Sequence, residues 1–393
     1  MVLDKESRMY FDEMVEWRRE FHSTPELGFQ EFNTSKKVIE LLESFGLKVH
    51  KEFSETSVIG VLDTGKKGKV VGIRADMDAL PMDDLKDVSY KSKNKGVCHA
   101  CGHDVHTAIL LGVAKYFSEH REDLAGTLKF VFQAAEEGPA PGGAKLIMDS
   151  GLLDDVDIML GAHTHVDYET GTIIFKNDEM LAGGDFFDIK LIGSGGHGAY
   201  PNACVDLIAS VGGILGQFQN IISREIDPTK ICVLSICGLS AGEHGAKNVM
   251  PHELNMSGTI RYLDKPTRDF VVERIEKILN GFCELNGCSY EFLNNEMFPI
   301  LRNDNDLNAV VRDIAGSLVG IENVHELPDV DTGSEDFSYY SNRISSCYFY
   351  FGVRNNSKNC NAPFHHPLFD ADEECMPVVQ STFINSAIAL LKE

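Results

Sequence analysis

Residues 97–114 read V-C-H-A-C-G-H-D-V-H-T-A-I-L-L-G-V-A, and this stretch joins two patterns. Its first half gathers thiol, imidazole and carboxylate side chains, which belong to Cys98, His99, Cys101, His103, Asp104 and His106. Thiolates and imidazoles bind zinc, manganese, cobalt or iron, and a carboxylate can bridge a pair of such ions. The second half is almost continuously apolar, as at the start of a buried helix. The stretch therefore predicts a metal site beside a core helix.

Two other interpretations of the Cys98-x-x-Cys101 pair stay open. The pair could be half of a structural zinc site or a redox-active dithiol. A four-cysteine zinc site needs a second C-x-x-C pair, and the sequence contains none. The residues favour a catalytic metal over both interpretations.

Composition narrows the class of protein. A chain of 393 residues is long enough for two or three domains. Its formal net charge of -24 disfavours binding to nucleic acid or to an anionic membrane surface, because both would repel it. The charged N-terminus and the lack of a long apolar run favour a cytoplasmic location. The ten cysteines are scattered, so we expect them to be reduced.

Strand and helix patterns alternate in the first part of the chain. Strands are expected at 69–73, 127–133 and 156–161, and helices at 106–117 and 143–148. This alternation predicts an α/β domain built on a mixed, largely parallel sheet.

Metal-capable side chains follow each of these strands. They are Asp76 and Asp78, then Glu136 and Glu137, then His163 and His165. Binding sites in open α/β sheets lie at the carboxyl ends of the strands. We therefore expect these clusters to converge on one site.

Two adjacent glutamates at a strand end can have different roles in a metal site. If the backbone turns after the strand, one of Glu136 and Glu137 can bind metal while the other takes a proton from water. The alternative is a pair of solvated loop charges. His365, in H-H-P at 365–367, is a further ligand candidate, and its alternative is an exposed loop histidine.

The pattern changes near residue 185. Strands and helices are then expected in the order βαββαβ, which matches a ferredoxin-like unit. We expect residues 184–297 to form a domain inserted into a catalytic domain made of residues 1–183 and 298–393. Within it, Arg261 could clamp a carboxylate through its forked donors, or could form only a surface ion pair.

The segment G-S-G-G-H-G at 193–198 fits the G-x-G-x-x-G pattern of dinucleotide sites. Such a site requires a helix that opens on the glycines, whereas A-Y-P intervenes here. A glycine-rich turn that presents His197 is the better interpretation. A nicotinamide-dependent oxidoreductase is therefore only a distant alternative.

Taken together, the motifs resemble the M20 metallopeptidase superfamily, in particular its amidohydrolase branch of aminoacylases, hippurate hydrolases and auxin-conjugate hydrolases. The resemblance covers nearly the whole chain. It is carried by H-S-T-P-E-L-G-F-Q-E at 22–31, G-I-R-A-D-M-D-A-L-P at 72–81, C-H-A-C-G-H-D-V-H-T-A at 98–108, Q-A-A-E-E-G at 133–138, G-A-H at 161–163, G-S-G-G-H-G-A-Y-P at 193–201, N-V-M-P at 248–251, G-S-E-D-F at 333–337 and H-H-P-L-F-D at 365–370.

The resemblance implies a role for particular residues. The ligands of two divalent ions per subunit, which could be zinc, manganese, cobalt or nickel, would be Cys101, His103, Glu137, His163 and His365. Glu136 would be the general acid and base, and Asp78 would orient a ligand. The inserted domain would act as a lid and dimerisation domain, with His197 reaching the substrate of the partner subunit. Asn248 and Arg261 would hold substrate.

The reaction that the resemblance implies is hydrolysis of the amide bond of N-acyl amino acids, or of related small amides, by a metal-activated water. A dipeptidase or aminopeptidase of the same superfamily is the alternative, and a non-catalytic metal-binding protein is a more distant one. Two positions depart from the superfamily pattern. Asp76-Met-Asp78 stands where other branches have His-x-Asp, and T-H-V-D follows His163, so a role for His165 stays open.

Overall fold

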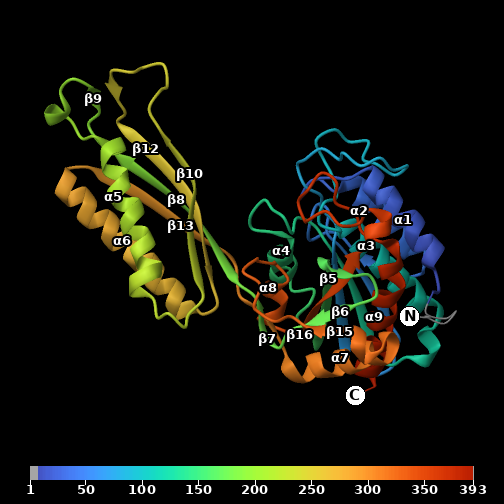
Figure 1. Cartoon of the computed structure of the whole chain (residues 1–393). Coiled ribbons are helices and arrows are strands. Elements are labelled where there is room, and N and C mark those ends of the chain that lie inside the picture. Colours follow the sequence, from blue (N-terminus) through green and yellow to red (C-terminus); the bar gives the residue numbers. More distant parts are fainter. Residues whose placement is uncertain (1–7, 393) are drawn as a thin grey trace. The chain divides into compact units, whose positions relative to one another are not determined.

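The structure, a computed structural model, describes residues 8–392 (Figure 1). The chain folds into two compact units. The larger unit contains the described residues up to Met180, together with Arg302–Val330 and the chain from Asp336 onward. The smaller unit contains Leu181–Leu301 and Asp331–Glu335. The expected inserted segment, 184–297, lies within the smaller unit, to which a short downstream segment also belongs.

The larger unit is built on an eight-stranded sheet with the order β1-β2-β4-β3-β5-β16-β6-β15. Its strands are β1 (Lys48–His50), β2 (Val58–Asp63), β3 (Val70–Asp76), β4 (Thr127–Gln133), β5 (Ile158–Glu169), β6 (Ile173–Phe175), β15 (Val324–Glu326) and β16 (Ser345–Arg354). Strand β3 pairs in parallel with both β4 and β5, and β5 pairs in parallel with β16. Strand β2 runs antiparallel to both of its neighbours. The sheet is therefore mixed, as predicted.

Helices cover both faces of this sheet. They are α1 (Phe11–Ser23), α2 (Phe32–Ser44), α3 (His103–Glu119), α4 (Gly143–Asp149), α7 (Asn305–Val319), α8 (Ser338–Ser341) and α9 (Met376–Leu391). Helices α1, α3 and α9 lie together on one side of the sheet, and α4 and α8 lie on the other (Figure 1). Nearly every residue in the first three turns of α3 is buried, so this helix forms the centre of the core.

Three predicted element boundaries at the site were wrong. Strand β3 runs to Asp76 rather than ending at 73, so Asp76 lies within the strand rather than after it. Helix α3 begins at His103 rather than at 106, because Gly102 (φ 89) turns the chain directly into the helix. Strand β5 runs to Glu169 rather than ending at 161, because β16 pairs alongside it. His163 and His165 therefore lie within a strand rather than after one.

The smaller unit has a four-stranded antiparallel sheet in the order β10-β12-β8-β13. Its elements are β8 (Gly183–Ile192), α5 (Leu207–Asn220), β10 (Cys232–Ala241), β12 (Glu253–Tyr262), α6 (Lys265–Asn286) and β13 (Ser289–Phe298). This is the predicted βαββαβ order. Two short pairs complete the described sheets, β9 (Gly196–His197) with β11 (Val249–Met250) and β7 (Asp178–Leu181) with β14 (Leu301–Asn303).

Between residues 8 and 392, no helix is both long enough and apolar enough to cross a membrane.

A buried arginine links three elements of the larger unit. Arg18 of α1 is fully buried, and its Nε lies 2.8 Å from Asp104 Oδ2 at the start of α3. Its other nitrogens contact Asp370 and Glu373. Burial alone would raise the pKa of Asp104, but Arg18 and His22 hold it well below its usual range. The network therefore fixes the first turn of α3 against α1 and the chain near Asp370.

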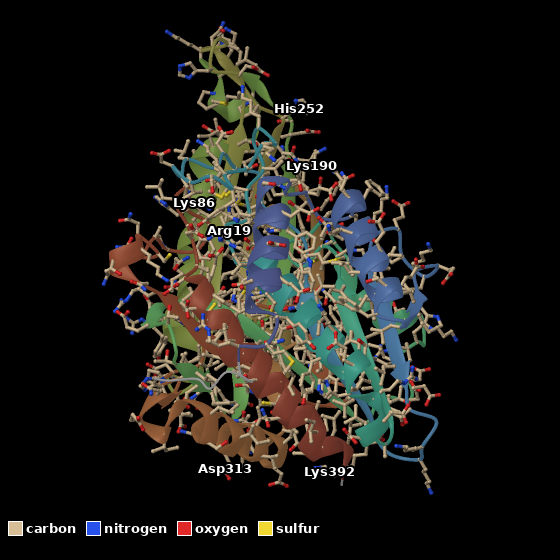
Figure 2. All side chains as sticks on the ribbon, turned by 90° about the vertical axis from the view of Figure 1, so that its right-hand side faces the viewer. Arg19, Lys86, Lys190, His252, Asp313 and Lys392 are labelled. Atoms are coloured by element: carbon tan, nitrogen blue, oxygen red, sulfur yellow. The ribbon has the colours of Figure 1, made fainter. Side chains whose placement is uncertain are left out.

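We predict that Arg18→Met lowers the free energy of unfolding of the larger unit by about 3 to 5 kcal/mol, because it leaves buried carboxylates without a counter-charge. Arg19→Met is the matched control. Arg19 is 45% exposed and is labelled in Figure 2, and its loss should cost less than about 1 kcal/mol. Urea unfolding followed by the fluorescence of Trp17, the only tryptophan, measures both variants. Equal losses in the two variants would contradict the prediction.

Candidate metal centre

Three of the predicted ligands come together from a loop, a helix and a strand. Cys101 precedes α3, His103 is the first residue of that helix, and His163 lies in β5. The Cys101 Sγ lies 3.3 Å from His163 Nε2. The ligand atoms of all three residues lie within 4.8 Å of one another.

The remaining predicted ligands join the same cluster. Glu137 Oε1 lies 2.9 Å from His365 Nε2. Cys101, Glu137 and His365 form a second group of ligand atoms within 4.8 Å, and His103, Glu136 and Glu137 form a third. Because the three groups share members, the larger unit brings all five predicted ligands and Glu136 to one centre.

The two inner histidines are oriented as metal ligands are. The Nδ1 atoms of His103 and His163 lie 2.9 Å and 2.7 Å from the carbonyl oxygens of Asp78 and Thr164. Each ring therefore turns its Nε2 toward the cluster, and the buried Nε2 of His103 has no hydrogen-bond partner. Metal-binding histidines commonly donate their other ring nitrogen in this way. The donor set of thiol, imidazole and carboxylate therefore fits divalent transition metals.

The electrostatics of the cluster also favour a bound cation. Burial raises the pKa of the Cys101 thiol well above its usual range, and the Glu137 and Glu136 carboxylates raise it further. Burial would lower the pKa of His103, but Asp76 and Asp78 outweigh it and raise that pKa to about 10. Cys101 and His103 therefore hold protons when no metal ion is present.

Asp78 holds the loop that carries the two glutamates. Its Oδ1 accepts a hydrogen bond from the Glu136 backbone N–H at 3.0 Å, and its Oδ2 accepts one from that of Glu137 at 2.9 Å. Its Oδ1 also lies 3.3 Å from His103 Nδ1. The residue therefore contacts both sides of the centre, which is the placement expected of a carboxylate that orients a ligand.

Asp76 and His106, both among the metal-capable residues of the sequence, form a pair beside the centre. Asp76 Oδ1 lies 2.6 Å from His106 Nδ1, and Asp76 Oδ2 accepts a hydrogen bond from Arg74 at 2.6 Å. His106 Nε2 accepts the backbone N–H of Thr164, next to His163. The D-M-D spacing in the sequence could have indicated that Asp76 supports the centre beside Asp78, since alternate residues at a strand end can both reach one site.

Two members of the opening motif and His165 lie apart from the cluster around Cys101 and His103. Cys98 lies with His22 and Asp84, where Lys86 Nζ is 2.7 Å from His22 Nε2. The ring of His165 lies against those of Tyr168 and Tyr350. His99 is buried at a distance, with its ring 6.1 Å from that of His22.

The other three predicted site residues lie in the smaller unit. His197 of β9 is exposed and pairs with Val249 of β11, and the backbone N–H of Gly198 donates to the carbonyl of Asn248. His197 and Asn248 are therefore neighbours. Arg261 of β12 is half-buried, and its guanidinium lies 5.4 Å from the centroid of the Phe186 ring.

The glycine-rich segment is a turn and not a nucleotide loop. It contains the short strand β9, and the next α-helix, α5, begins only at Leu207. The helix that a dinucleotide site requires directly after the glycines does not follow them. The predicted turn that presents His197 is therefore the observed arrangement.

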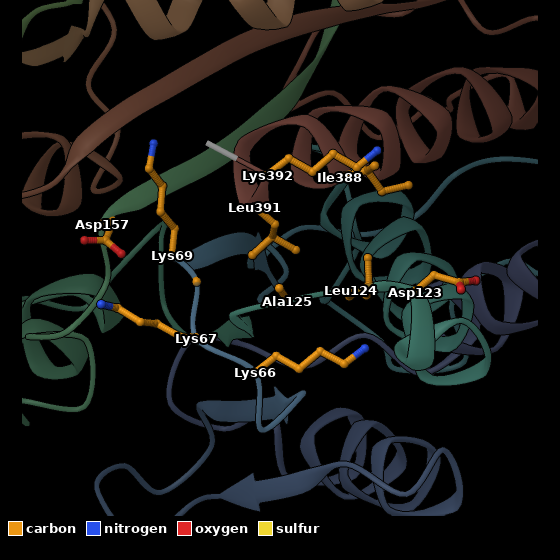
Figure 3. A pocket seen from close by; sticks show the side chains of 11 residues that line it. Lys66, Lys67, Lys69, Asp123, Leu124, Ala125, Asp157, Ile388, Leu391 and Lys392 are labelled. Atoms are coloured by element: carbon orange, nitrogen blue, oxygen red, sulfur yellow. The ribbon is translucent and has the colours of Figure 1, made fainter.

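A pocket of about 780 Å³ lies away from the cluster and does not bear on its chemistry (Figure 3). It is lined by Lys66, Lys67, Lys69 and Lys392, with Asp123 and Asp157. Lys69 directly precedes β3, whereas Asp76 ends that strand. The pocket thus lies at the amino ends of the parallel strands and the cluster at their carboxyl ends.

Comparisons with known proteins agree with this site. Residues 72–384 match the model of peptidase family M20/M25/M40. An Arabidopsis thaliana IAA-amino acid hydrolase is 37% identical over 98% of this chain and 87% of its own length. An N-acyl-L-amino acid amidohydrolase of Geobacillus stearothermophilus is 44% identical over 71% of this chain and 75% of its own. A Bacillus subtilis structure described as a dinuclear metal-binding peptidase of family M20 covers 99% of both chains at 31% identity, with a TM-score of 0.83.

The fold and the cluster define a metal-dependent hydrolase that acts on amide bonds. The chain belongs to peptidase family M20/M25/M40. The predicted family, fold class and type of enzyme are therefore confirmed.

We predict that metal binding to the metal-free protein at pH 7.5 releases about two protons, one from Cys101 and one from His103, because thiolate and neutral imidazole are the binding forms. Affinity should accordingly fall by about 100-fold for each pH unit below this value. Calorimetric titration with zinc in buffers of different ionisation enthalpy measures the number of protons.

Cys101→Ala should release one proton fewer than the wild type. The control, Cys98→Ala, removes a buried thiol that lies with His22 and Asp84 and not in the groups that contain Cys101 and His103, and it should release the wild-type number. A heat of binding that is independent of the buffer would show that the donors are already deprotonated.

Proposed function

We propose that this protein hydrolyses the amide bond of N-acyl amino acids or closely related small amides. The observation that carries the proposal is the convergence of the five proposed ligands, Cys101, His103, Glu137, His163 and His365, around Glu136. The amino-acid amides named for the plant and Geobacillus relatives support this class of substrate.

We propose two divalent ions, because the ligand groups overlap through Cys101 and Glu137. The Bacillus subtilis relative described as dinuclear supports the same number. Zinc, manganese, cobalt and nickel all suit this donor set. When bound, such ions polarise a carbonyl group and lower the pKa of water.

Glu136 is the proposed proton carrier. Its carboxylate is buried, and its Oε2 lies 4.0 Å from His103 Nε2. It takes a proton from water as the water oxygen attacks the amide carbon, and it delivers that proton to the nitrogen as the carbon–nitrogen bond breaks. The products are a carboxylic acid and a free amine.

In the smaller unit, we propose that residues 184–297 act as a lid and dimerisation domain. The exposed ring of His197 can donate a hydrogen bond to the substrate carbonyl of a partner subunit. Arg261 would bind the substrate carboxylate through its paired N–H groups, and Asn248 would contact the substrate beside it. Sedimentation equilibrium tests the homodimer, and a monomer at micromolar concentration would exclude action in the partner subunit.

We also propose a cytoplasmic location, which the ten free cysteines of the described chain support.

A dipeptidase or aminopeptidase is the second candidate, because the Bacillus subtilis relative is described as a peptidase. Such enzymes act on substrates with a free α-amine, whereas a deacylase requires that nitrogen to be acylated. Amine release from matched dipeptides and N-acyl amino acids by the metal-restored protein separates the two activities.

We predict that Glu136→Gln lowers kcat by about 100- to 10,000-fold, because the amide cannot carry the proton. Metal content, measured by atomic emission, should stay at the wild-type value. Glu16→Gln, at an exposed position of α1, is the control and should keep full activity. Retained turnover in Glu136→Gln would exclude the proposed role.

We predict that Arg261→Ala raises KM for N-acyl amino acids by about 10- to 100-fold, because a charge-assisted hydrogen bond to the carboxylate is lost. KM for the corresponding carboxamides, which lack that charge, should change little. Arg274→Ala removes a surface arginine that pairs with Glu225 in the same unit and is the control. An equal rise for both substrate classes would show that Arg261 does not recognise the carboxylate.

A further inference from the structure

The N-terminal motif H-S-T-P-E-L-G-F-Q-E, residues 22–31, has no part in the proposed chemistry, yet it lies directly against the loop that carries Glu136. The backbone N–H of Ala79, next to Asp78, donates to the carbonyl of Glu26 at 2.8 Å. Gly28 faces the other side of the loop, where an added Cβ would lie 2.0 Å from the carbonyl oxygen of Gly138. The motif therefore packs against both parts of the chain that form the carboxylate side of the centre.

The loop itself adopts a conformation that needs support. Ala135 has φ 53, in the left-handed region that a residue with a Cβ rarely occupies. This turn directly after β4 brings Glu136 and Glu137 to the same ligand group instead of to opposite faces of a strand. An unfavourable backbone conformation at a site persists only where the surrounding contacts hold it.

Each backbone N–H from Ala134 to Glu137 donates a hydrogen bond to a side-chain oxygen. The N–H groups of Glu136 and Glu137 donate to Asp78. That of Ala134 donates to Ser57 Oγ at 3.1 Å. The N–H of Ala135, the left-handed residue, donates to Glu31 Oε1 at 2.9 Å. Glu31 therefore holds the left-handed residue at which the chain turns directly after β4.

Burying a carboxyl group such as that of Glu31 costs free energy, and a purely structural position would not require it. Its side chain is fully buried, and its other oxygen accepts a hydrogen bond from the Thr56 hydroxyl at 2.7 Å. Within residues 8–392 no lysine or arginine pairs with it. Burial, and to a smaller extent the Asp78 carboxylate, raise the pKa of Glu31 to about 7. A carboxyl group kept in such a place indicates a use for its two acceptor oxygens.

We infer that Glu31 is a positioning residue, which fixes the left-handed turn at Ala135 and so aims the Glu136 carboxylate at the reacting atoms. This inference rests on the proposed role of Glu136. It assigns a use to the 22–31 motif, whose residues contact the loop without being metal ligands.

The first test is independent of activity. Hydrogen–deuterium exchange of metal-free Glu31→Ala should be faster than wild type by about tenfold or more in peptides that cover 134–138, and unchanged in peptides from β3 and β5. Val38→Ala is the matched control, because Val38 is fully buried in the adjacent α2 and belongs to the hydrophobic core. Val38→Ala should leave exchange in 134–138 unchanged. Wild-type exchange there in Glu31→Ala would overturn the inference.

The second test separates positioning from stability. Metal-loaded Glu31→Ala should lose about 10- to 100-fold in kcat with KM unchanged, whereas Val38→Ala should keep kcat. Glu31→Gln should restore most of the loss, because its amide oxygen can still accept from Ala135 and its NH2 can donate to Thr56. Equal losses in Glu31→Ala and Val38→Ala would overturn the inference.

If Glu31→Ala does not fold, Glu31→Asp replaces it in both experiments, because the shorter side chain keeps the carboxylate but does not reach the backbone N–H of Ala135. Glu136→Gln is assayed in parallel on the same substrate. If Glu136→Gln is inactive and Glu31→Ala is fully active, the positioning role alone is wrong. If Glu136→Gln is active, the proposed role of Glu136 is wrong. If the wild-type enzyme with metal restored does not hydrolyse the substrate, the proposed function is wrong. In either case, unchanged hydrogen–deuterium exchange in Glu31→Ala separately excludes the positioning role.

Discussion

The metal centre depends on the parallel pairing of three neighbouring strands. Because β3 pairs in parallel with both β4 and β5, the carboxyl ends of β3 and β4 lie beside the part of β5 that contains His163. This pairing brings Asp78, Glu137 and His163 together from distant parts of the sequence. A shift of one residue in the pairing of β3 with β4 or with β5 would turn the side chains of the shifted strand to the opposite face of the sheet. The geometry of the site therefore depends on the register of the strands.

The same pairing concentrates negative charge in a place from which water is largely excluded. Arg74 is buried between Asp76 and Asp336 and offsets part of this charge. Protons on Cys101 and His103 offset more of it when metal is absent. Metal ions bound in the proposed centre would replace those protons, so that ion binding would add to the stability of the larger unit.

Much of this arrangement could be predicted from sequence because its signals are local. Alternating strands and helices predicted the mixed sheet, and the βαββαβ order predicted the smaller unit. The length of β5 could not be predicted, because it depends on β16, which lies far downstream. The hydrogen bond between Glu31 and Ala135 could not be predicted either, because no local sequence pattern at either residue indicates a contact between the two segments.

Chain order has a consequence for the newly made protein. Cys101, His103, Glu137 and His163 leave the ribosome early, but β16 and His365 follow only after the whole smaller unit has been synthesised. Until then β5 lacks the neighbour beside His163, and the long-range pairing that completes the sheet is intrinsically slow. A nascent chain therefore holds only part of the proposed set of metal donors for much of its synthesis, and the proposed centre becomes complete only after His365 has been added.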